Sequence, residues 1–219
     1  MEIIRYAELK AQPWRNGGGV TREVASHPAG APSGPGAEAG GWDWRVSIAD
    51  VSKAGDFSAF PGMDRVLTVV EGELLLLNVD GAEHPLEKYR PFRFAGAAAA
   101  SGALPTGDIR DLNVITRTGA FKGYTSIIEL SKKRAHPVFE GQLGILLQGQ
   151  ATVAPGTAGA GTANTADVEP AGSAAGAAGT AAGRTTLARY DAVVGSDTDT
   201  PEILGRGFLA VVSIDRVAD

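Results

Sequence analysis

The sequence predicts an all-β protein built from two β-barrels, and three observations carry this prediction. Apolar and polar residues alternate with a period of two in the segment 42–49, as in a strand whose two faces meet different surroundings. Short runs rich in Val, Ile, Leu and Thr recur between turn signals, and no segment holds a long helical period. The pattern of the first half also returns in the second half, so we expect two similar barrels side by side.

The expected strands are short and follow one another closely. One face of the first carries Trp42, Trp44, Val46 and Ile48, and the other carries Asp43, Arg45, Ser47 and Ala49. Further runs fall at 65–70, 73–79, 112–116, 124–130, 145–148 and 208–214. Turn signals separate them at Glu71-Gly72-Glu73, Asp80-Gly81 and Gln148-Gly149-Gln150. Such an arrangement is typical of a sandwich or a barrel.

The internal repeat sets the domain boundaries. It pairs Leu67–Glu73 with Gly144–Gln150, Leu86–Arg90 with Leu187–Asp191, and Asp111–Arg117 with Leu209–Arg216. The second copy is longer because residues 151–183, with 13 Ala and 7 Gly among 33 positions, interrupt it. We interpret this stretch as a loop grown inside the second repeat, and the Pro-rich residues 27–41 as a second insert. A first barrel is expected over 1–120 and a second over 121–219, with the N-terminal strand free to pair with the second half.

Composition argues against several functional classes. A net charge of −5, from 20 basic and 25 acidic residues, disfavours binding to nucleic acid or to an anionic membrane. The basic run Lys132-Lys133-Arg134 is interpreted as a solvated loop. The absence of cysteine excludes a disulfide framework, a thiolate nucleophile and Cys-ligated metal. The sequence shows no signal-peptide pattern and no membrane-spanning apolar run, so we expect a cytoplasmic protein.

Metal and nucleophilic chemistry find little support in the sequence. The three histidines, His27, His84 and His136, each precede proline and have no ligand spacing to one another, so we expect neither a metal nor another cofactor. No Gly-x-Ser-x-Gly elbow is present to make a serine nucleophilic. General acid–base chemistry by Asp64 or Asp111 stays open.

The segment 13–23, Pro-Trp-Arg-Asn-Gly-Gly-Gly-Val-Thr-Arg-Glu, is the most distinctive local cluster. Three consecutive glycines mark positive φ angles or a close approach of the backbone to another group. One interpretation is an Asn-Gly hairpin turn. The other is the rim of a ligand site, in which Trp14 stacks while Asn16 and backbone N–H groups form hydrogen bonds.

Two further clusters contain polar residues in strand-like positions. In the segment 55–65, the neighbours Asp64 and Arg65 point to opposite faces if they begin a strand, so at most one of them faces inward. In the segment 107–113, Asp111 and Asn113 share one face by the period of two. This polar face either meets solvent or lines a pocket inside a barrel.

Together these segments resemble the HutD/Ves family. The resemblance rests on residues 13–23, 44–49, 55–65, 94–96 and 111–114, covers the first 117 residues in register, and extends more weakly to the second half. It implies a bicupin, two jelly-roll cupin barrels in one chain without cupin metal histidines. It also implies a regulatory or ligand-sensing role in bacterial histidine utilisation, or for Ves-type relatives a link to cold and stress responses. Urocanate and a formylated glutamate are the ligands it suggests.

A site for urocanate needs an arginine for the carboxylate, an aromatic plane, and Asp or Asn groups for the ring nitrogens. Arg45 or Arg65, Trp14 or Phe60, and Asp111 or Asn113 supply these groups. The predicted ligand-binding residues are Trp14, Asn16, Gly17, Gly18, Thr21, Arg45, Ser47, Phe60, Asp64, Arg65, Asp111 and Asn113.

Three functional hypotheses follow from the sequence. The first is a metal-free bicupin that binds a small carboxylate or imidazole metabolite and modulates histidine catabolism. The second is a cupin-type isomerase, lyase or hydrolase with Asp64, Asp111 or Glu23 as the acid–base group. The third is a scaffold that binds other proteins. A homodimer is left open.

Overall fold

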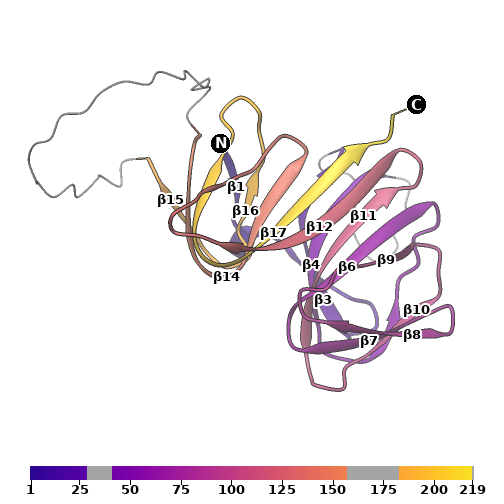
Figure 1. Ribbon diagram of the computed structural model, residues 1–219. Helices are drawn as coiled ribbons and strands as arrows, with labels where there is room; N and C mark the ends of the chain where they lie inside the picture. Colours follow the sequence, from indigo (N-terminus) through magenta and orange to yellow (C-terminus); the bar gives the residue numbers. More distant parts are fainter. Residues whose placement is uncertain (29–40, 157–182, 219) are drawn as a thin grey trace, which may run out of the picture.

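The computed structural model describes residues 1–28, 41–156 and 183–218, and these form strands in three sheets (Figure 1). Apart from one short 3-10 turn, η1 (Tyr6–Glu8), the described residues contain no helix. The all-β prediction is therefore confirmed. Residues 157–182 of one expected insert, and 29–40 of the other, lie outside the described residues.

Two antiparallel sheets enclose the first barrel. A six-stranded sheet has the order β2-β3-β4-β11-β6-β9, and a four-stranded sheet has the order β5-β10-β7-β8. The six-stranded sheet consists of β2 (Ala11–Pro13), β3 (Gly19–His27), β4 (Trp44–Val51), β6 (Met63–Glu71), β9 (Phe92–Ala95) and β11 (Ile109–Arg117). The four-stranded sheet consists of β5 (Gly55–Phe57), β7 (Leu74–Val79), β8 (Ala82–Glu87) and β10 (Ala100–Ala103).

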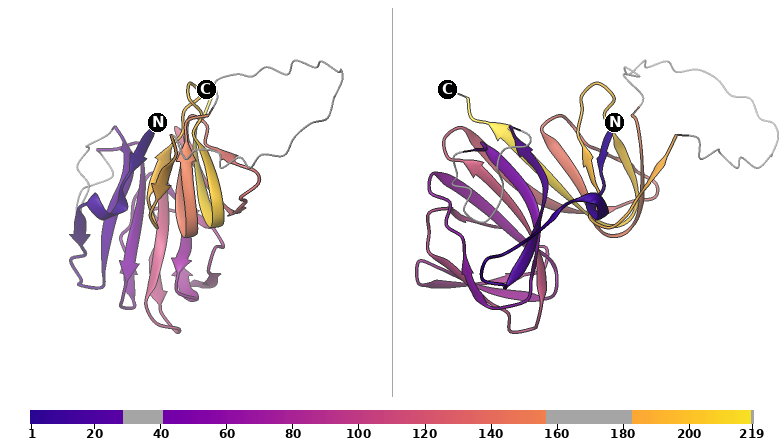
Figure 2. Two further views of the ribbon diagram at one scale, coloured as in Figure 1. Left: turned by 90° about the vertical axis from the view of Figure 1, so that its left-hand side faces the viewer. Right: turned by 180° about the vertical axis from the view of Figure 1, so that it is seen from behind.

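One strongly curved seven-stranded sheet forms the second barrel (Figure 2). Its main path is β1-β16-β14-β17-β12, with β13 beside β17 and β15 beside β14. The strands are β1 (Glu2–Ile4), β12 (Phe121–Leu130), β13 (His136–Pro137), β14 (Gln142–Ala154), β15 (Thr185–Leu187), β16 (Ala192–Val194) and β17 (Glu202–Arg216). Because β1 pairs with β16, the N-terminal segment begins in the second barrel and crosses to the first before β2.

The central strands of the first barrel are buried on both faces. Residues of β4, β6 and β11 such as Val46 and Leu112 pack against Ile145 and its neighbours in the second barrel. Alternate residues, among them Leu67 and Val69, face the interior of the first barrel. The predicted period of two is therefore confirmed, and side chains with odd numbers in these strands point into the first barrel as far as Val69 of β6. A bulge after Val69 reverses the alternation, so Glu71 points toward the second barrel.

Two tyrosines make reciprocal contacts between the barrels and show that the repeat is structural. Tyr89 and Tyr190 occupy equivalent positions and have nearly equal positive φ angles, 67° and 69°. The Tyr89 hydroxyl donates to Gln148 Oε1 at 3.2 Å, and the Tyr190 hydroxyl donates to Glu71 Oε2 at 2.7 Å. Since Gln148 and Glu71 are also equivalent in the repeat, the two contacts relate the barrels by an approximate two-fold axis.

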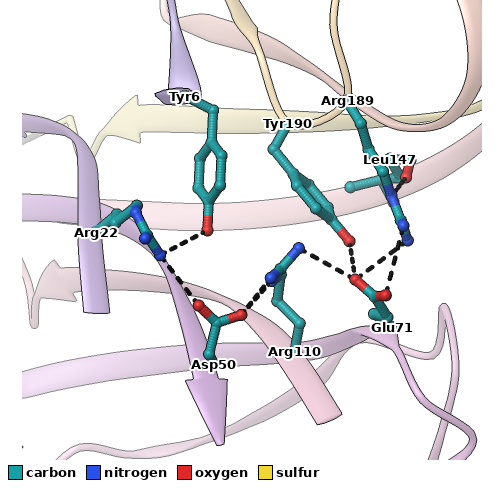
Figure 3. A network of polar contacts seen from close by, with 8 residues as sticks. All are labelled: Tyr6, Arg22, Asp50, Glu71, Arg110, Leu147, Arg189 and Tyr190. Carbon is teal, nitrogen blue, oxygen red and sulfur yellow. Dashed lines mark hydrogen bonds and ion pairs between the residues drawn. The ribbon is translucent and has the colours of Figure 1, made fainter. Parts of the chain in front are cut away.

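A polar network continues from Glu71 along the junction of the two barrels (Figure 3). The Glu71 carboxylate lies 3.3 Å from Arg189 of the second barrel and 3.1 Å from Arg110 of the first. Arg110 also contacts Asp50 at 2.5 Å, and Asp50 contacts Arg22 at 3.0 Å. These side chains are half-exposed, so the network fixes how the barrels meet more than it adds to stability.

The structure differs from the prediction around Gly149, where the sequence predicts a turn. β14 instead runs through this point, bent by a β-bulge between Leu146 and Gln148. Gly149 has φ of 100° and lies opposite Gly207, whose φ is 119°. In the first repeat the equivalent Gly72 makes a true turn between β6 and β7.

The predicted insert also begins too early. Residues 151–154 belong to β14, where Val153 pairs with Thr185 of β15. Ala151 and Val153 are buried in the core of the second barrel. Small residues at these positions suit a crowded strand, which composition alone does not distinguish from a loop.

Substituting Gly207 tests the close backbone approach in the second barrel. A Cβ on Gly207 would overlap the carbonyl oxygen of Gln148, and the positive φ adds strain. We expect Gly207→Ala to lower the free energy of unfolding by about 2 kcal/mol or more, measured by urea denaturation.

Gly107→Ala is the matched control, because Gly107 has φ of 98° but its added Cβ would meet no other atom within 4 Å. Gly107→Ala is therefore expected to lower the free energy of unfolding only by the cost of placing alanine at a positive φ angle. Equal effects of the two substitutions would contradict the proposed steric origin.

Candidate functional site

A cavity of about 300 Å³ opens inside the first barrel, between the six-stranded sheet and the segments before β3 and after β5. Eight of the predicted residues line it: Trp14, Asn16, Thr21, Arg45, Ser47, Phe60, Arg65 and Asn113. The other lining residues are Gln12, Arg15, Ala49, Asp56, Phe57, Ser58 and Ile115.

Strand register explains why distant residues meet in the cavity. Ser47 of β4 lies opposite Asn113 of β11, and Arg45 lies opposite Ile115. Arg65 of β6 lies on the other side of Ile115. Directly opposed residues share a face of the sheet, so these side chains all point inward.

Arg65 is the most deeply buried cation of the site, with 3% of its surface exposed. Its guanidinium donates to Asn113 Oδ1 at 2.8 Å and to the carbonyl oxygen of Ser58 at 3.2 Å. Phe94 and Phe60 lie 4.9 and 5.4 Å from its central carbon, as cation–π neighbours. Burial lowers the pKa of Arg65 to about 10, so the side chain is still charged at neutral pH.

Asp111 lies behind Asn113 and supports it. The Asn113 side-chain amide donates to Asp111 Oδ1, and Asp111 is completely buried. Burial raises the pKa of Asp111 to about 7, although the charge of Arg65 opposes that change. The three residues form a chain in which a neutral amide joins a buried carboxyl group to a buried guanidinium.

Arg45 approaches the cavity from the neighbouring strand. Its guanidinium carbon lies 5.1 Å from the Trp42 ring centre and 5.6 Å from that of Phe60. Burial lowers the pKa of Arg45, while the nearby charge of Glu23 opposes this. Arg65 contacts the same phenylalanine, so both guanidinium carbons lie within 5.6 Å of the Phe60 ring centre.

The Gly-rich segment forms both a hairpin turn and a wall of the cavity. The Gly18 N–H donates to Asn16 Oδ1 at 2.9 Å, and the Gly17 N–H donates to the carbonyl oxygen of Trp14 at 3.0 Å. Trp14 Nε1 donates to Thr21 Oγ1 at 2.8 Å, which fixes the indole against the cavity. The hairpin-turn interpretation is therefore confirmed. Trp14 and Asn16 also line the cavity, and their binding of a ligand stays a prediction.

Four predicted residues do not line the cavity. The N–H groups of Gly17 and Gly18 serve the turn itself. Asp64 points to the face opposite Arg65, as neighbouring strand residues must. Asp111 is hidden behind Asn113.

Sequence reasoning missed several lining residues. Asp56, Phe57 and Ser58 lie in the segment 55–65 that it had singled out, but a short strand gives no signal of which side chains turn inward. Gln12 and Arg15 flank the glycine hairpin and could have been inferred from Trp14, because Gln12 pairs with Thr21.

The described residues contain no group of three or more His, Asp or Glu side chains arranged to hold a metal ion. His27, His84 and His136 lie on separate strands, and none lines the cavity. Within the described part of the chain, no helix has the length and apolar character needed to cross a membrane.

Two barrels of this kind in one chain, with a polar cavity in the first, define a bicupin, as the sequence predicted. The HutD family model matches residues 6–211, and the chain belongs to the HutD family. The resemblance drawn from the sequence motifs is thus confirmed.

Two curated relatives align with part of the chain. Protein Ves of Citrobacter koseri is 34% identical over 131 residues, which cover 59% of this chain and 64% of Ves. An uncharacterized 21.2 kDa protein in the hutC 3′ region of Pseudomonas putida is 39% identical over 116 residues, covering 52% of this chain and 57% of that protein. The aligned part therefore spans less than two thirds of either relative.

Solved structures match over almost the whole length. HutD from Pseudomonas fluorescens SBW25, determined in a formate condition, is 25% identical with a TM-score of 0.68, and 99% of both chains is covered. A conserved protein of unknown function from Pseudomonas aeruginosa PAO1 gives 24% identity and a TM-score of 0.72 at the same coverage. An oxalate decarboxylase from Lactobacillus farciminis, 9% identical over 97% of this chain and 85% of its own, has a TM-score of 0.58 and shares the fold alone.

Replacing Asn113 tests the chain from Asp111 to Arg65. Asn113→Leu keeps the number and branching of the side-chain heavy atoms but removes both hydrogen bonds, so it leaves two buried charged groups without their link. We expect the free energy of unfolding, measured in urea at pH 7, to fall by about 3 kcal/mol. Ser47→Ala, at the buried position opposite Asn113, is the control with a small effect. A loss below about 1 kcal/mol for Asn113→Leu would show that the link is unimportant.

Proposed function

We propose that this protein binds a small carboxylate metabolite in the cavity of the first barrel, and that binding rather than catalysis is its function. The observation that carries the proposal is the presence of two largely buried guanidinium groups at one cavity. Within the described residues, the Nε atoms of Arg45 and Arg65 are buried and have no hydrogen-bond partner. Buried donors of this kind are usually satisfied, so their state favours an anionic partner.

The electrostatics of the cavity support the same proposal. Two guanidinium groups contact Phe60 from different strands, and the charge of Arg45 contributes to the lowered pKa of Arg65. Among the described residues, the lining contains one carboxylate, that of the exposed Asp56. A bound carboxylate would offset the repulsion between the two cations and accept hydrogen bonds from both guanidinium groups.

The shape of the cavity favours a flat or short ligand. Its volume of about 300 Å³ is at the lower end for small-molecule sites. Trp14, Phe57 and Phe60 supply aromatic surface, while Ser47 and Asn113 supply groups for hydrogen bonding. Urocanate, a planar imidazole with one carboxylate, and N-formylglutamate, with two carboxylates and an amide, both suit this combination.

Membership of the HutD family leads us to propose a regulatory role in histidine utilisation. The name of the Pseudomonas putida relative places it beside hutC, which agrees with this role. In the proposal, the protein senses or sequesters an intermediate of histidine breakdown, and this binding limits the flux through the pathway. Among the described residues, Asp56 is the one carboxylate in the lining of the cavity that could serve as an acid–base group, so we favour binding over catalysis.

Calorimetric titration with urocanate and with N-formylglutamate tests the proposal. We expect at least one of them to bind, and Arg45→Met and Arg65→Met each to weaken that binding by about tenfold or more, since each removes a hydrogen bond between charged groups. Arg90→Met, at an exposed position outside the cavity, is the control. Binding that is unchanged in both folded cavity variants would contradict the proposal.

The same samples separate binding from catalysis. Chromatography of each ligand after prolonged incubation with the protein is expected to return it unchanged. Conversion of either ligand at a rate proportional to protein concentration would instead establish an enzyme.

A further inference from the structure

Asp111 is a buried carboxyl group that the binding site does not use directly. It is fully enclosed on β11, behind Asn113, which lines the cavity. Oδ1 accepts a hydrogen bond from the Asn113 amide, whereas Oδ2 is buried and has no partner among the described residues. Buried charged oxygens rarely lack a partner, because no hydrogen bond then offsets the free-energy cost of removing them from water.

Asn113 links this carboxyl group to the cavity in one orientation. Its amide nitrogen donates to Asp111, and its oxygen accepts from Arg65 Nη2 at 2.8 Å. Protonation of Asp111 at Oδ2 leaves both hydrogen bonds intact, because Oδ1 remains an acceptor. The structure therefore accommodates a neutral or a charged Asp111 without changing the position of Arg65.

We propose that binding of an anion in the cavity is coupled to the uptake of one proton by Asp111 at Oδ2. This inference rests on the proposed carboxylate-binding function and describes how that binding is regulated. In the ligand-free protein the Asp111 carboxylate balances the charge of Arg65. When a ligand carboxylate binds to Arg65, a proton from solvent joins Asp111, so the buried charge stays constant and Asp111 acts as a positioning residue for Arg65.

The groups around Asp111 support this coupling. Its cross-strand neighbours, Ala49 of β4 and Val69 of β6, are buried and apolar. Two charged side chains act on it: Arg65 of β6 stabilises the carboxylate, and Asp50 of β4 disfavours it. Across the barrel, the core residues of β7 and β10 carry no titratable group.

The remaining charges near Asp111 are already engaged in the network between the barrels. Asp50 is held by Arg110 and by Arg22, and Arg110, the neighbour of Asp111 on β11, points to the opposite face. Arg65 is therefore the cation on which the Asp111 carboxylate depends. When a ligand carboxylate binds to Arg65, the charge of Arg65 no longer stabilises the Asp111 carboxylate. The two remaining influences on Asp111, its burial and the negative charge of Asp50, both favour the protonated form.

Calorimetry with N-formylglutamate tests the coupling, because both carboxylates of this probe stay ionised from pH 6 to 8. Titrations in two buffers with different heats of ionisation give the number of protons taken up on binding. Because about half of the Asp111 side chains are already protonated at pH 7 in the free protein, we expect uptake of about 0.4 proton at that pH, and an affinity about fivefold weaker at pH 8 than at pH 6. Asp111→Asn should bind with no such pH dependence, and Asp108→Asn, at an exposed position outside the cavity, should retain it.

A spectroscopic titration tests Asp111 in the wild-type protein, so the result does not depend on a variant that folds. Carbon-13 NMR of the side-chain carboxyl groups, with Asp111 assigned by its absence from Asp111→Asn or by coupling to its own backbone, follows its protonation directly. We expect a midpoint near neutral pH in the free protein and a higher midpoint with N-formylglutamate bound. The Asn113 side-chain amide signals should shift with the same midpoint.

Each outcome gives a distinct answer. Binding without proton uptake, or an Asp111 carboxyl group that titrates only in the acidic range, would overturn the coupling and leave carboxylate binding in place. Absence of binding by N-formylglutamate and urocanate at every pH would overturn the proposed function, and the coupling with it.

Discussion

The central constraint of this molecule is that its main sheet is buried on both faces. One face of β4, β6 and β11 packs against the second barrel, and the other encloses the first barrel. A strand in such a sheet normally has apolar residues on both sides. On the inner face, Arg65, Asp111 and Asn113 depart from this pattern, and each must be satisfied by a partner or by a ligand. Arg65 and Asn113 line the cavity on this face, and Asp111 is hydrogen-bonded to Asn113.

The equivalent positions in the described strands of the second barrel carry different residues. In the repeat, Asp111 and Asn113 correspond to Leu209 and Val211, which are buried in an apolar core. The position of Arg65 is taken by Gln142, which donates to Ser213 at 3.1 Å, the residue in the position of Ile115. The two barrels thus share one plan, and residues of the second barrel such as Leu143 and Ile145 supply apolar surface against which the first barrel packs.

Much of the fold and part of the site could be predicted from the sequence, because a period of two in a strand shows which residues share a face. This period placed Asp111 and Asn113 on one face and Asp64 and Arg65 on opposite faces, and the internal repeat predicted two barrels. The sequence did not show whether the face that carries Asp111 and Asn113 meets solvent or a pocket. That depends on which other sheet covers this face, and a local sequence pattern contains no information on such long-range contacts. The bend at Gly149 was missed for the same reason: a glycine that permits a turn also permits the close crossing of two strands, and only the partner Gly207 distinguishes them.

Arg45 and Arg65 are proposed to hold one carboxylate together, and the function of the cavity depends on this claim more than on any other. A crystal structure of the protein with N-formylglutamate, compared with a ligand-free crystal from a medium without carboxylic acids, measures it directly. We expect a carboxylate of the ligand within hydrogen-bonding distance of both guanidinium groups, with its chain along Phe60 and Trp14 and with Asn113 still bonded to Arg65. A ligand bound elsewhere, or one in the cavity whose carboxylates avoid both arginines, would contradict the claim.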